Sequence, residues 1–349
     1  MNNKIDIRQL TLEELTKKIV DLGEKPYRAN QIHDWLWKKR AIVFSEMTNL
    51  SKPFRKLIED NFTINAIQLK EAQNSKDSTI KNAFLLADGA VIEGVLIPTK
   101  KRMTACVSVQ VGCSLDCTFC ATGRLKRVRN LNADEIYDQV VMINNQSKKE
   151  YDAPISNIVY MGMGEPLLNY NSVLISIDRI TSPNGLGMSP KRITLSTAGI
   201  SKMITKLADD RVKFNLALSL HAANDEKRNK IMPINESNSL SSLKEAMIYF
   251  ANKTGTRPTL EYIIFKDFND EISDAKELVQ FGKSFPSKVN IIEYNSIDQG
   301  KFQQAQKDKV DAFASYLESQ KVIVNMRRSR GKDIDAACGQ LANKNELVN

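Results

Sequence analysis

The chain has 349 residues, of which 42% are hydrophobic and 26% charged, and its formal net charge is +9 at pH 7. This composition is typical of a folded protein with one large core and an accessory domain, and it excludes an intrinsically disordered chain. No apolar run reaches the roughly 18 residues that a membrane span requires, and residues 1–18 lack the apolar core of a secretion signal. We therefore expect a cytoplasmic protein without membrane contact, whose five cysteines serve metal binding or redox chemistry rather than structural disulfides.

Residues 1–97 have a pattern of their own. Residues 11–60 predict short helices in which aromatic and apolar side chains lie among cations. Residues 65–97 predict a small β-meander, because the step Asp88-Gly89 between two apolar runs is a strong hairpin signal. A polar and basic stretch follows, so we place a domain boundary between residues 97 and 98.

From about residue 104, short β-rich runs alternate with longer amphipathic stretches. The predicted strands are residues 105–111, 155–161, 192–196, 214–220, 259–265, 289–294 and 321–326. The predicted helices are residues 132–147, 170–181, 200–209, 239–253, 270–284 and 304–319. This alternation is typical of a parallel sheet with right-handed crossovers, either open and doubly wound or a full or partial (β/α) barrel. The G-x-G-x-x-G turn of dinucleotide-binding folds does not follow the first strand.

The segment CSLDCTFC places Cys113, Cys117 and Cys120 directly after the first predicted strand. A structural zinc site would need a fourth ligand, but the sequence offers no second cysteine pair and only two histidines, His33 and His221. A thioredoxin-like redox pair would use Cys117 and Cys120 and leave Cys113 without a role. A 4Fe–4S cluster would use all three thiolates and leave one iron open for a small molecule. The spacing favours the cluster.

Other predicted strands also end in polar residues. In MGMGEPLLN, Gly164 allows the backbone to approach a ligand closely, and Glu165 can hold an ammonium group. Later strands end near Ser196, Ser219, His221 and Asn295. Each of these residues alone is more typical of a cap, a turn or a hydrogen-bonded core position. Together they indicate an active site at the carboxyl ends of barrel strands.

Two basic runs lie beside cysteine segments. RLKRVR follows the three clustered cysteines, and RRSRGK precedes Cys338. Each run alone is typical of a solvated face. Their placement beside both cysteine segments favours a polyanionic substrate near the chemistry.

The spacing C-x3-C-x2-C, with Phe119 before the third cysteine, resembles the motif of the radical SAM superfamily. The segments CVSVQVGCSLDCTFCATG, MGMGEPLLN, SLHA and GKDIDAACGQLA together resemble the RlmN/Cfr family of RNA methyltransferases over nearly the whole chain. The resemblance implies an α/β fold, with a partial (β/α)6 TIM-like barrel over residues 98–330. It also implies a small α+β RNA-recognition domain over residues 1–97 and a C-terminal segment, residues 331–349, that carries a methyl-carrier cysteine.

The resemblance further implies one 4Fe–4S cluster held by Cys113, Cys117 and Cys120, with S-adenosylmethionine bound at the open iron. The implied reaction is methylation of carbon 2 of adenosine 2503 in 23S rRNA and of adenosine 37 in tRNAs. Each turnover would consume two molecules of S-adenosylmethionine and electrons from an external, flavodoxin-like donor. We expect the protein to act as a monomer.

The resemblance also assigns roles to single residues. Cys338 would carry a methyl group, Cys106 would release the product by forming a disulfide with Cys338, and Glu93 would remove the proton from carbon 2. Without the resemblance, a lone cysteine is typical of a small buried hydrophobe. Glu93, in AVIEGVL, would be an exposed edge-strand residue, or a carboxylate whose apolar neighbours make it a stronger base. The implied S-adenosylmethionine contacts are Gly164, Glu165, Ser196, Ser219, Leu220, His221 and Asn295.

Two alternatives stay open. A Cfr-type enzyme would methylate carbon 8 of the same rRNA adenosine, although Pro166 after Glu165 is more similar to the carbon 2 enzymes. A protein of another class would bind RNA without catalysis and hold a structural zinc ion at the clustered cysteines.

Overall fold

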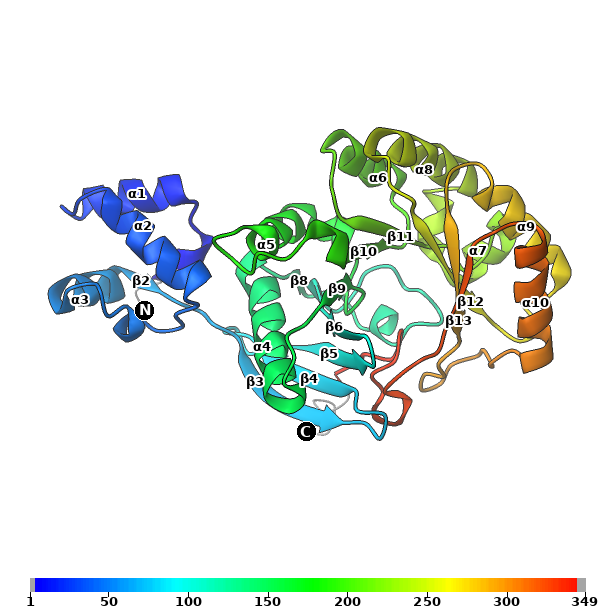
Figure 1. The fold of residues 1–349 in the computed structure, drawn as a ribbon, viewed down its shortest axis with the longest axis horizontal. Helices are drawn as coiled ribbons and strands as arrows, with labels where there is room; N and C mark the ends of the chain where they lie inside the picture. Colours follow the sequence, from blue (N-terminus) through cyan, green and yellow to red (C-terminus); the bar gives the residue numbers. More distant parts are fainter. Residues whose placement is uncertain (1–3, 344–349) are drawn as a thin grey trace.

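The structure of the protein is a computed structural model that describes residues 4–343. Residues 1–3 of the predicted N-terminal domain and 344–349 of the predicted C-terminal segment lie outside the described residues. In Figure 1 a small helical lobe (blue) lies to one side of a larger α/β body. Within the described residues, no helix has the length and apolar character to cross a membrane.

The lobe confirms the short helices predicted for residues 11–60. Its helices are α1 (Leu12–Asp21), α2 (Tyr27–His33) and α3 (Lys52–Asn61), and β1 (Ile5–Asp6) pairs in parallel with β2 (Phe62–Thr63). Helix α1 begins at a capping box, in which Thr11 and Glu14 each bond the other's backbone N–H. Helix α3 begins after Ser51, whose hydroxyl accepts from the N–H of Phe54.

The body is built on a sheet of ten strands in the order β14-β13-β12-β11-β10-β9-β6-β5-β4-β3. The bounds are β3 (Gln68–Asn74), β4 (Ile80–Leu85), β5 (Val91–Thr99), β6 (Arg102–Cys106), β9 (Asn157–Tyr160), β10 (Ile193–Thr197), β11 (Asn215–Ser219), β12 (Thr259–Ile264), β13 (Lys288–Glu293) and β14 (Val324–Arg327). Strand β6 and strands β9 to β14 pair in parallel, which makes seven such strands within residues 4–343. The α/β fold is confirmed, and β14 adds one strand to the six that the resemblance implied.

Helices connect the parallel strands and cover the outer face of the sheet (Figure 1). They are α4 (Ala133–Tyr151), α5 (Tyr170–Thr181), α6 (Ser201–Asp209), α7 (Asp225–Ile231), α8 (Leu240–Thr254), α9 (Ile272–Gly282) and α10 (Lys307–Ser319). All six predicted helices are present. Helix α7 was not predicted, because it is short and its sequence, DEKRNKI, looks like a solvated charge run.

The predicted hairpin is confirmed, and it belongs to the same sheet. Strands β4 and β5 pair antiparallel around Asp88-Gly89, where Gly89 has a φ of +85°. Strand β5 then pairs antiparallel with β6, the first of the parallel strands. The boundary placed between residues 97 and 98 therefore falls inside β5.

The first predicted strand, residues 105–111, is broken. Strand β6 ends at Cys106, and β7 (Gln110–Val111) pairs instead with β8 (Arg129–Asn130) in a separate two-stranded sheet. The break has a tertiary cause, because the N–H groups of Val109 and Gln110 both donate to the carbonyl of Met163. As a result, the three clustered cysteines lie in a loop enclosed between β7 and β8.

Candidate active site

The cysteine loop, residues 112–124, is held in a tight fold by its backbone. Gly112 has a φ of +75°, and an added Cβ would lie 2.2 Å from the carbonyl oxygen of Lys126, so this position requires glycine. The N–H of Cys113 donates to the carbonyl of Leu125, and the N–H of Cys120 donates to that of Cys117. These bonds bring the three cysteines onto one short turn.

The three thiols influence one another's charge. Burial raises the pKa of Cys113 to about 11 and also raises those of Cys117 and Cys120. A thiolate at either Cys113 or Cys120 raises the pKa of Cys117 further, so the three sulfurs lie within interaction range. Thiolates in such surroundings need a bound cation, and iron supplies one. The donor set therefore fits a cluster held by three thiolates.

Among residues 4–343, no group of three or more His, Cys, Asp or Glu side chains is placed to hold a single metal ion. A structural zinc site needs four ligands around one ion. A 4Fe–4S cluster takes one thiolate at each iron that the protein binds.

Aromatic rings from other parts of the chain pack against Phe119 of the cysteine loop. The Phe119 ring lies 4.9 Å from the His221 ring and 5.6 Å from the Phe265 ring, measured between centroids. The Nδ1 atom of His221 accepts from the N–H of Ile263 at 3.1 Å. Burial, together with the Arg228 guanidinium, lowers the pKa of His221 to about 3, so this imidazole is neutral at pH 7.

Gly164 and Glu165 form the glycine turn that the sequence predicts after β9. Gly164 has a φ of +93°, and an added Cβ would meet the side chain of Gln110 at 2.5 Å. The Glu165 carboxylate is buried and accepts from the N–H groups of Leu167 at 3.0 Å and Ala198 at 2.8 Å. Burial raises the pKa of Glu165, and these two donors act in the opposite direction.

The other predicted contact residues lie at the carboxyl ends of neighbouring strands. The hydroxyls of Ser196 on β10 and Ser219 on β11 are 3.2 Å apart, and the buried Leu220 follows Ser219 directly. Asn295 follows β13, and its Nδ2 donates to the carbonyl of Cys338 at 3.2 Å. Within the described residues, no group donates to Asn295 Oδ1, although this atom is buried. A buried acceptor without a donor fits a site built for a ligand.

The C-terminal segment brings Cys338 to the cysteine loop. The N–H of Ala121 donates to the carbonyl of Gly339 at 2.7 Å, and the Thr122 hydroxyl donates to that of Leu341 at 2.6 Å. Cys338 is exposed as a residue, but the surrounding protein removes water from its sulfur, and this desolvation raises the pKa of the thiol to about 11.

A charge on Cys338 influences Cys106, and a charge on Cys120 influences Cys338. Burial raises the pKa of Cys106 to about 12, and a thiolate at Cys338 raises it further. A thiolate at Cys120 likewise raises the pKa of Cys338. The Arg327 guanidinium acts on both Cys106 and Cys338 in the opposite direction. Two cysteines that lie far apart in the sequence are thus both within range of the charge of Arg327.

Glu93 is buried rather than exposed at a sheet edge, and its surroundings include a charged partner as well as the apolar neighbours Val91 and Val95. The Nζ atom of Lys81, on the neighbouring strand β4, lies 3.4 Å from Glu93 Oε1. The N–H groups of Ala342 and Asn343 donate to Glu93 Oε2 at 2.8 and 3.1 Å. The carboxylate therefore has compensating partners from both β4 and the C-terminal segment.

Sequence reasoning missed three charged residues of the site. Lys81 could have been found from the hairpin register, because it lies two positions from Ala83, the residue opposite Glu93. Arg228 gave no signal, since it belongs to a charge run, yet it is fully buried and donates to the carbonyls of Leu220 and Ala198. Arg327 is ion-paired with the buried Glu261 at 2.9 Å, and only its place in a basic run was apparent.

The chain is similar to known proteins over nearly its whole length. Residues 5–64 match the family described as "Ribosomal RNA large subunit methyltransferase N-terminal domain", and residues 107–279 match the radical SAM superfamily. A protein of Christiangramia forsetii named "Probable dual-specificity RNA methyltransferase RlmN" is 58% identical, over 98% of this chain and 97% of its own length. A protein of Pseudothermotoga lettingae with the same name is 42% identical, over 98% of this chain and 99% of its own length.

The chain is also similar in fold to a solved structure. The crystal structure of a radical SAM methyltransferase from Sphaerobacter thermophilus matches with a TM-score of 0.90 and 35% identity, covering 97% of this chain and 99% of that one. Because the likeness of sequence and of fold extends over nearly the whole chain, the protein belongs to the RlmN family of radical SAM RNA methyltransferases.

Proposed function

We propose that the protein methylates carbon 2 of adenosine 2503 in 23S rRNA and of adenosine 37 in tRNAs, and that each turnover consumes two molecules of S-adenosylmethionine. The observation that carries the proposal is the position of the Cys338 segment, which hydrogen bonds from Ala121 and Thr122 hold against the cysteine loop, with Cys106 within range of the charge of Cys338. Carbon 2 of adenine lies between two ring nitrogens and is electron-poor, so it does not attack a methyl sulfonium directly. A cysteine thiolate can accept the methyl group first, and a carbon radical can then add to the ring.

Cys113, Cys117 and Cys120 would hold the cluster. When bound, the cluster would supply the electron that splits S-adenosylmethionine into methionine and a 5′-deoxyadenosyl radical. The unpartnered Oδ1 of Asn295 can accept a hydrogen bond from this substrate, and the buried Glu165 carboxylate can face its ammonium group. We assign the remaining contacts to residues on the neighbouring strand ends, namely Gly164, Ser196, Ser219, Leu220 and His221.

Cys338 and Cys106 would act in sequence. The Cys338 thiolate takes the methyl group, so that a bond from its sulfur to carbon forms as the sulfonium bond breaks. One hydrogen atom of this methyl group then passes to the 5′-deoxyadenosyl radical from the second S-adenosylmethionine, and the resulting methylene radical on Cys338 adds to carbon 2 of adenine. Once the adduct has lost the carbon 2 proton and returned one electron to the bound cluster, Cys106 sulfur attacks Cys338 sulfur. This step forms a disulfide and breaks the bond between Cys338 sulfur and carbon, and the released carbon takes up a proton. Glu93 accepts the proton from carbon 2, its negative charge being balanced by Lys81. External reductant must then cleave the disulfide.

RNA would be held by basic surface near this site. Lys126 and Arg127 are exposed directly after the cysteine loop, and Arg129 is fixed beside them by Glu135 and Asp88. We assign recognition of the RNA backbone to this run and to the N-terminal domain predicted over residues 1–97, because cations that bind phosphates can present one base out of its stack. We place the protein in the cytoplasm as a monomer that receives its electrons from a flavodoxin-like donor.

The test is mass spectrometry of nucleosides from rRNA and tRNA. A strain without its own copy of the gene is complemented with the wild-type chain or with Cys338→Ala, and both proteins are checked for equal expression. We expect 2-methyladenosine in both RNAs with the wild type and in neither with Cys338→Ala. The appearance of 8-methyladenosine instead would identify a Cfr-type enzyme. A colourless, zinc-containing protein after anaerobic purification would refute the cluster.

A further inference from the structure

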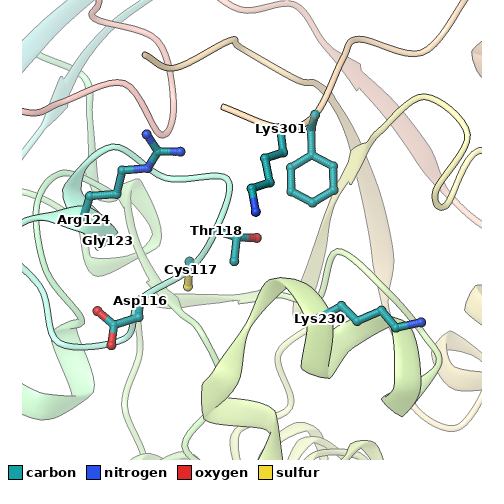
Figure 2. A pocket seen from close by; sticks show the side chains of 8 residues that line it. Asp116, Cys117, Thr118, Gly123, Arg124, Lys230 and Lys301 are labelled. Atoms are coloured by element: carbon teal, nitrogen blue, oxygen red, sulfur yellow. The ribbon is translucent and has the colours of Figure 1, made fainter. Parts of the chain in front are cut away.

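A pocket of about 430 Å³ lies against the cysteine loop. Figure 2 shows Cys117 and Thr118 on its wall, between Arg124 on one side and Lys230 on the other, with Lys301 above. None of the residues assigned to S-adenosylmethionine lines this pocket, and neither do Cys106 and Cys338. Of the residues assigned to the cluster, to S-adenosylmethionine and to methyl transfer, the pocket shares only Cys117.

Cys117, one of the three clustered cysteines, lines this pocket, and a stack of aromatic rings connects the pocket to the segment of Cys120. Phe302 lines the pocket, and its ring lies 4.6 Å from that of Phe265. The Phe265 ring lies 5.6 Å from that of Phe119, which directly precedes Cys120. Since electron tunnelling weakens steeply with distance and with gaps in packing, this thin and closely packed wall is a favourable path to a cluster bound at the thiols.

The charges around the pocket are mixed and mostly positive. Arg124 is fixed by the carbonyls of Asp298 and Gln299, and Lys301 is exposed beside it. Lys230 is paired with Glu226 at 2.7 Å, but both side chains are exposed, so the pair leaves the lysine available to a partner. Asp116 adds one negative charge to the same pocket. An aromatic centre with a polar rim is typical of a protein interface.

We propose that this pocket is the docking site for an acidic electron-carrier protein, which delivers electrons to the cluster across the wall at Cys117. The proposal rests on the proposed function, because only a redox-active cluster needs such a partner. A flavin hydroquinone in the carrier loses one electron and becomes a semiquinone, the bound cluster gains that electron, and no bond forms or breaks. Weak redox encounters have small interfaces, and complementary charge mainly raises their association rate.

The test uses the anaerobically reconstituted protein and a bacterial flavodoxin in its fully reduced form. The variant Lys230→Glu/Lys301→Glu changes two exposed side chains of the pocket. The matched control is Lys253→Glu/Lys307→Glu, which alters net charge equally on the exposed surface of α8 and α10. Binding is measured by calorimetry at low salt, and flavin oxidation by stopped-flow absorbance.

We expect the pocket variant to bind flavodoxin at least about tenfold more weakly than the wild type does. It should also oxidise reduced flavodoxin at least about tenfold more slowly. The control variant should match the wild type. With dithionite, which needs no docking, the pocket variant should methylate tRNA at the wild-type rate and bind tRNA with unchanged affinity. Unchanged flavodoxin binding would overturn the docking site, and so would a loss of tRNA affinity, which would make the pocket an RNA contact. Failure of the wild type to methylate RNA with dithionite would instead refute the proposed function.

Discussion

The amide of Asn295 offers a direct test of the site. Its Nδ2 donates to the carbonyl of Cys338, which fixes the orientation of the amide and leaves the buried Oδ1 without a donor among the described residues. A buried acceptor without a partner costs about 1–3 kcal/mol, and a ligand that donates to it recovers that free energy on binding. Asn295→Ala should therefore weaken S-adenosylmethionine binding by about 1–3 kcal/mol, or about 5- to 150-fold.

The same change should hardly affect the free energy of unfolding. Asn295→Ala loses one hydrogen bond, but it also removes the unsatisfied acceptor, so the two effects offset each other to within about 1 kcal/mol. Asn269 is the matched comparison, because this buried amide donates to the carbonyls of His221 and Ile263 and accepts from the N–H of Phe265. Asn269→Ala should cost about 3 kcal/mol, since it removes three hydrogen bonds.

Two measurements decide the matter. Urea unfolding of the cluster-free protein gives the stability of each variant, and calorimetry of S-adenosylmethionine with the anaerobically reconstituted protein gives its affinity. The reasoning is refuted if Asn295→Ala binds S-adenosylmethionine like the wild type. It is also refuted if Asn295→Ala loses as much stability as Asn269→Ala, because the acceptor would then have had a partner before the ligand arrived.

Three further predictions concern buried charges and the glycine turn. Lys81→Met should lower the free energy of unfolding, measured in urea, by about 3–5 kcal/mol because it leaves Glu93 buried without its cation. The double variant Lys81→Met/Glu93→Gln should recover most of this loss. Equal stability of the single and double variants would contradict the pairing. Burial raises the pKa of Asp134 to about 7, so the folded protein binds a proton at this carboxyl more tightly than the unfolded chain does. The stability that this proton contributes is complete below the usual carboxyl pKa and is lost as pH rises towards 7. Asp134→Asn should accordingly gain stability relative to the wild type between pH 5 and pH 8 in urea titrations, and a pH-independent difference would argue against the shift. Gly187 also has a positive φ but open space around it, so Gly187→Ala should lower the free energy of unfolding by roughly 1–2 kcal/mol. Gly164→Ala should cost more than this in thermal unfolding, because its new Cβ would also clash with Gln110. Equal costs would exclude the clash.

Local features of the sequence were sufficient to predict the structure wherever residues close together in the chain determine it. The alternation of strands and helices predicted the parallel sheet, and Asp88-Gly89 predicted the hairpin between β4 and β5. Polar residues at strand ends predicted the neighbourhood of Ser196 and Ser219, because the carboxyl ends of parallel strands meet at one edge. These features depend on spacing and turn chemistry, both of which are visible in a single sequence.

Tertiary contacts decided what the sequence could not predict. The apolar run 105–111 looks like one strand, and the break after Cys106 follows from hydrogen bonds to the carbonyl of Met163, far along the chain. Arg228 lies in a run of charges that is typical of a solvated surface, yet four hydrogen bonds to neighbouring groups allow its complete burial. In each case the deciding partner is remote in sequence, so no local pattern records it.

The two anchors of the C-terminal segment link the hairpin strands to the site. Before Cys338, the N–H of Gly331 donates to the Asp77 carboxylate at 2.9 Å, and Asp333 accepts from Ser75 at 2.5 Å, both in the turn between β3 and β4.

After Cys338, the N–H groups of Ala342 and Asn343 donate to Glu93 on β5. Cys338 is thus bracketed by the antiparallel part of the sheet, although the residues that directly follow it bond to Ala121 and Thr122 of the cysteine loop. Most of these anchors use backbone groups of the segment, so substitutions within it change the anchors little. Asp77 and Glu93 therefore hold the two ends of the segment, while Ala121 and Thr122 of the cysteine loop hold it beside Cys338. The antiparallel strands look like part of an accessory domain in the sequence, yet they help to position this segment.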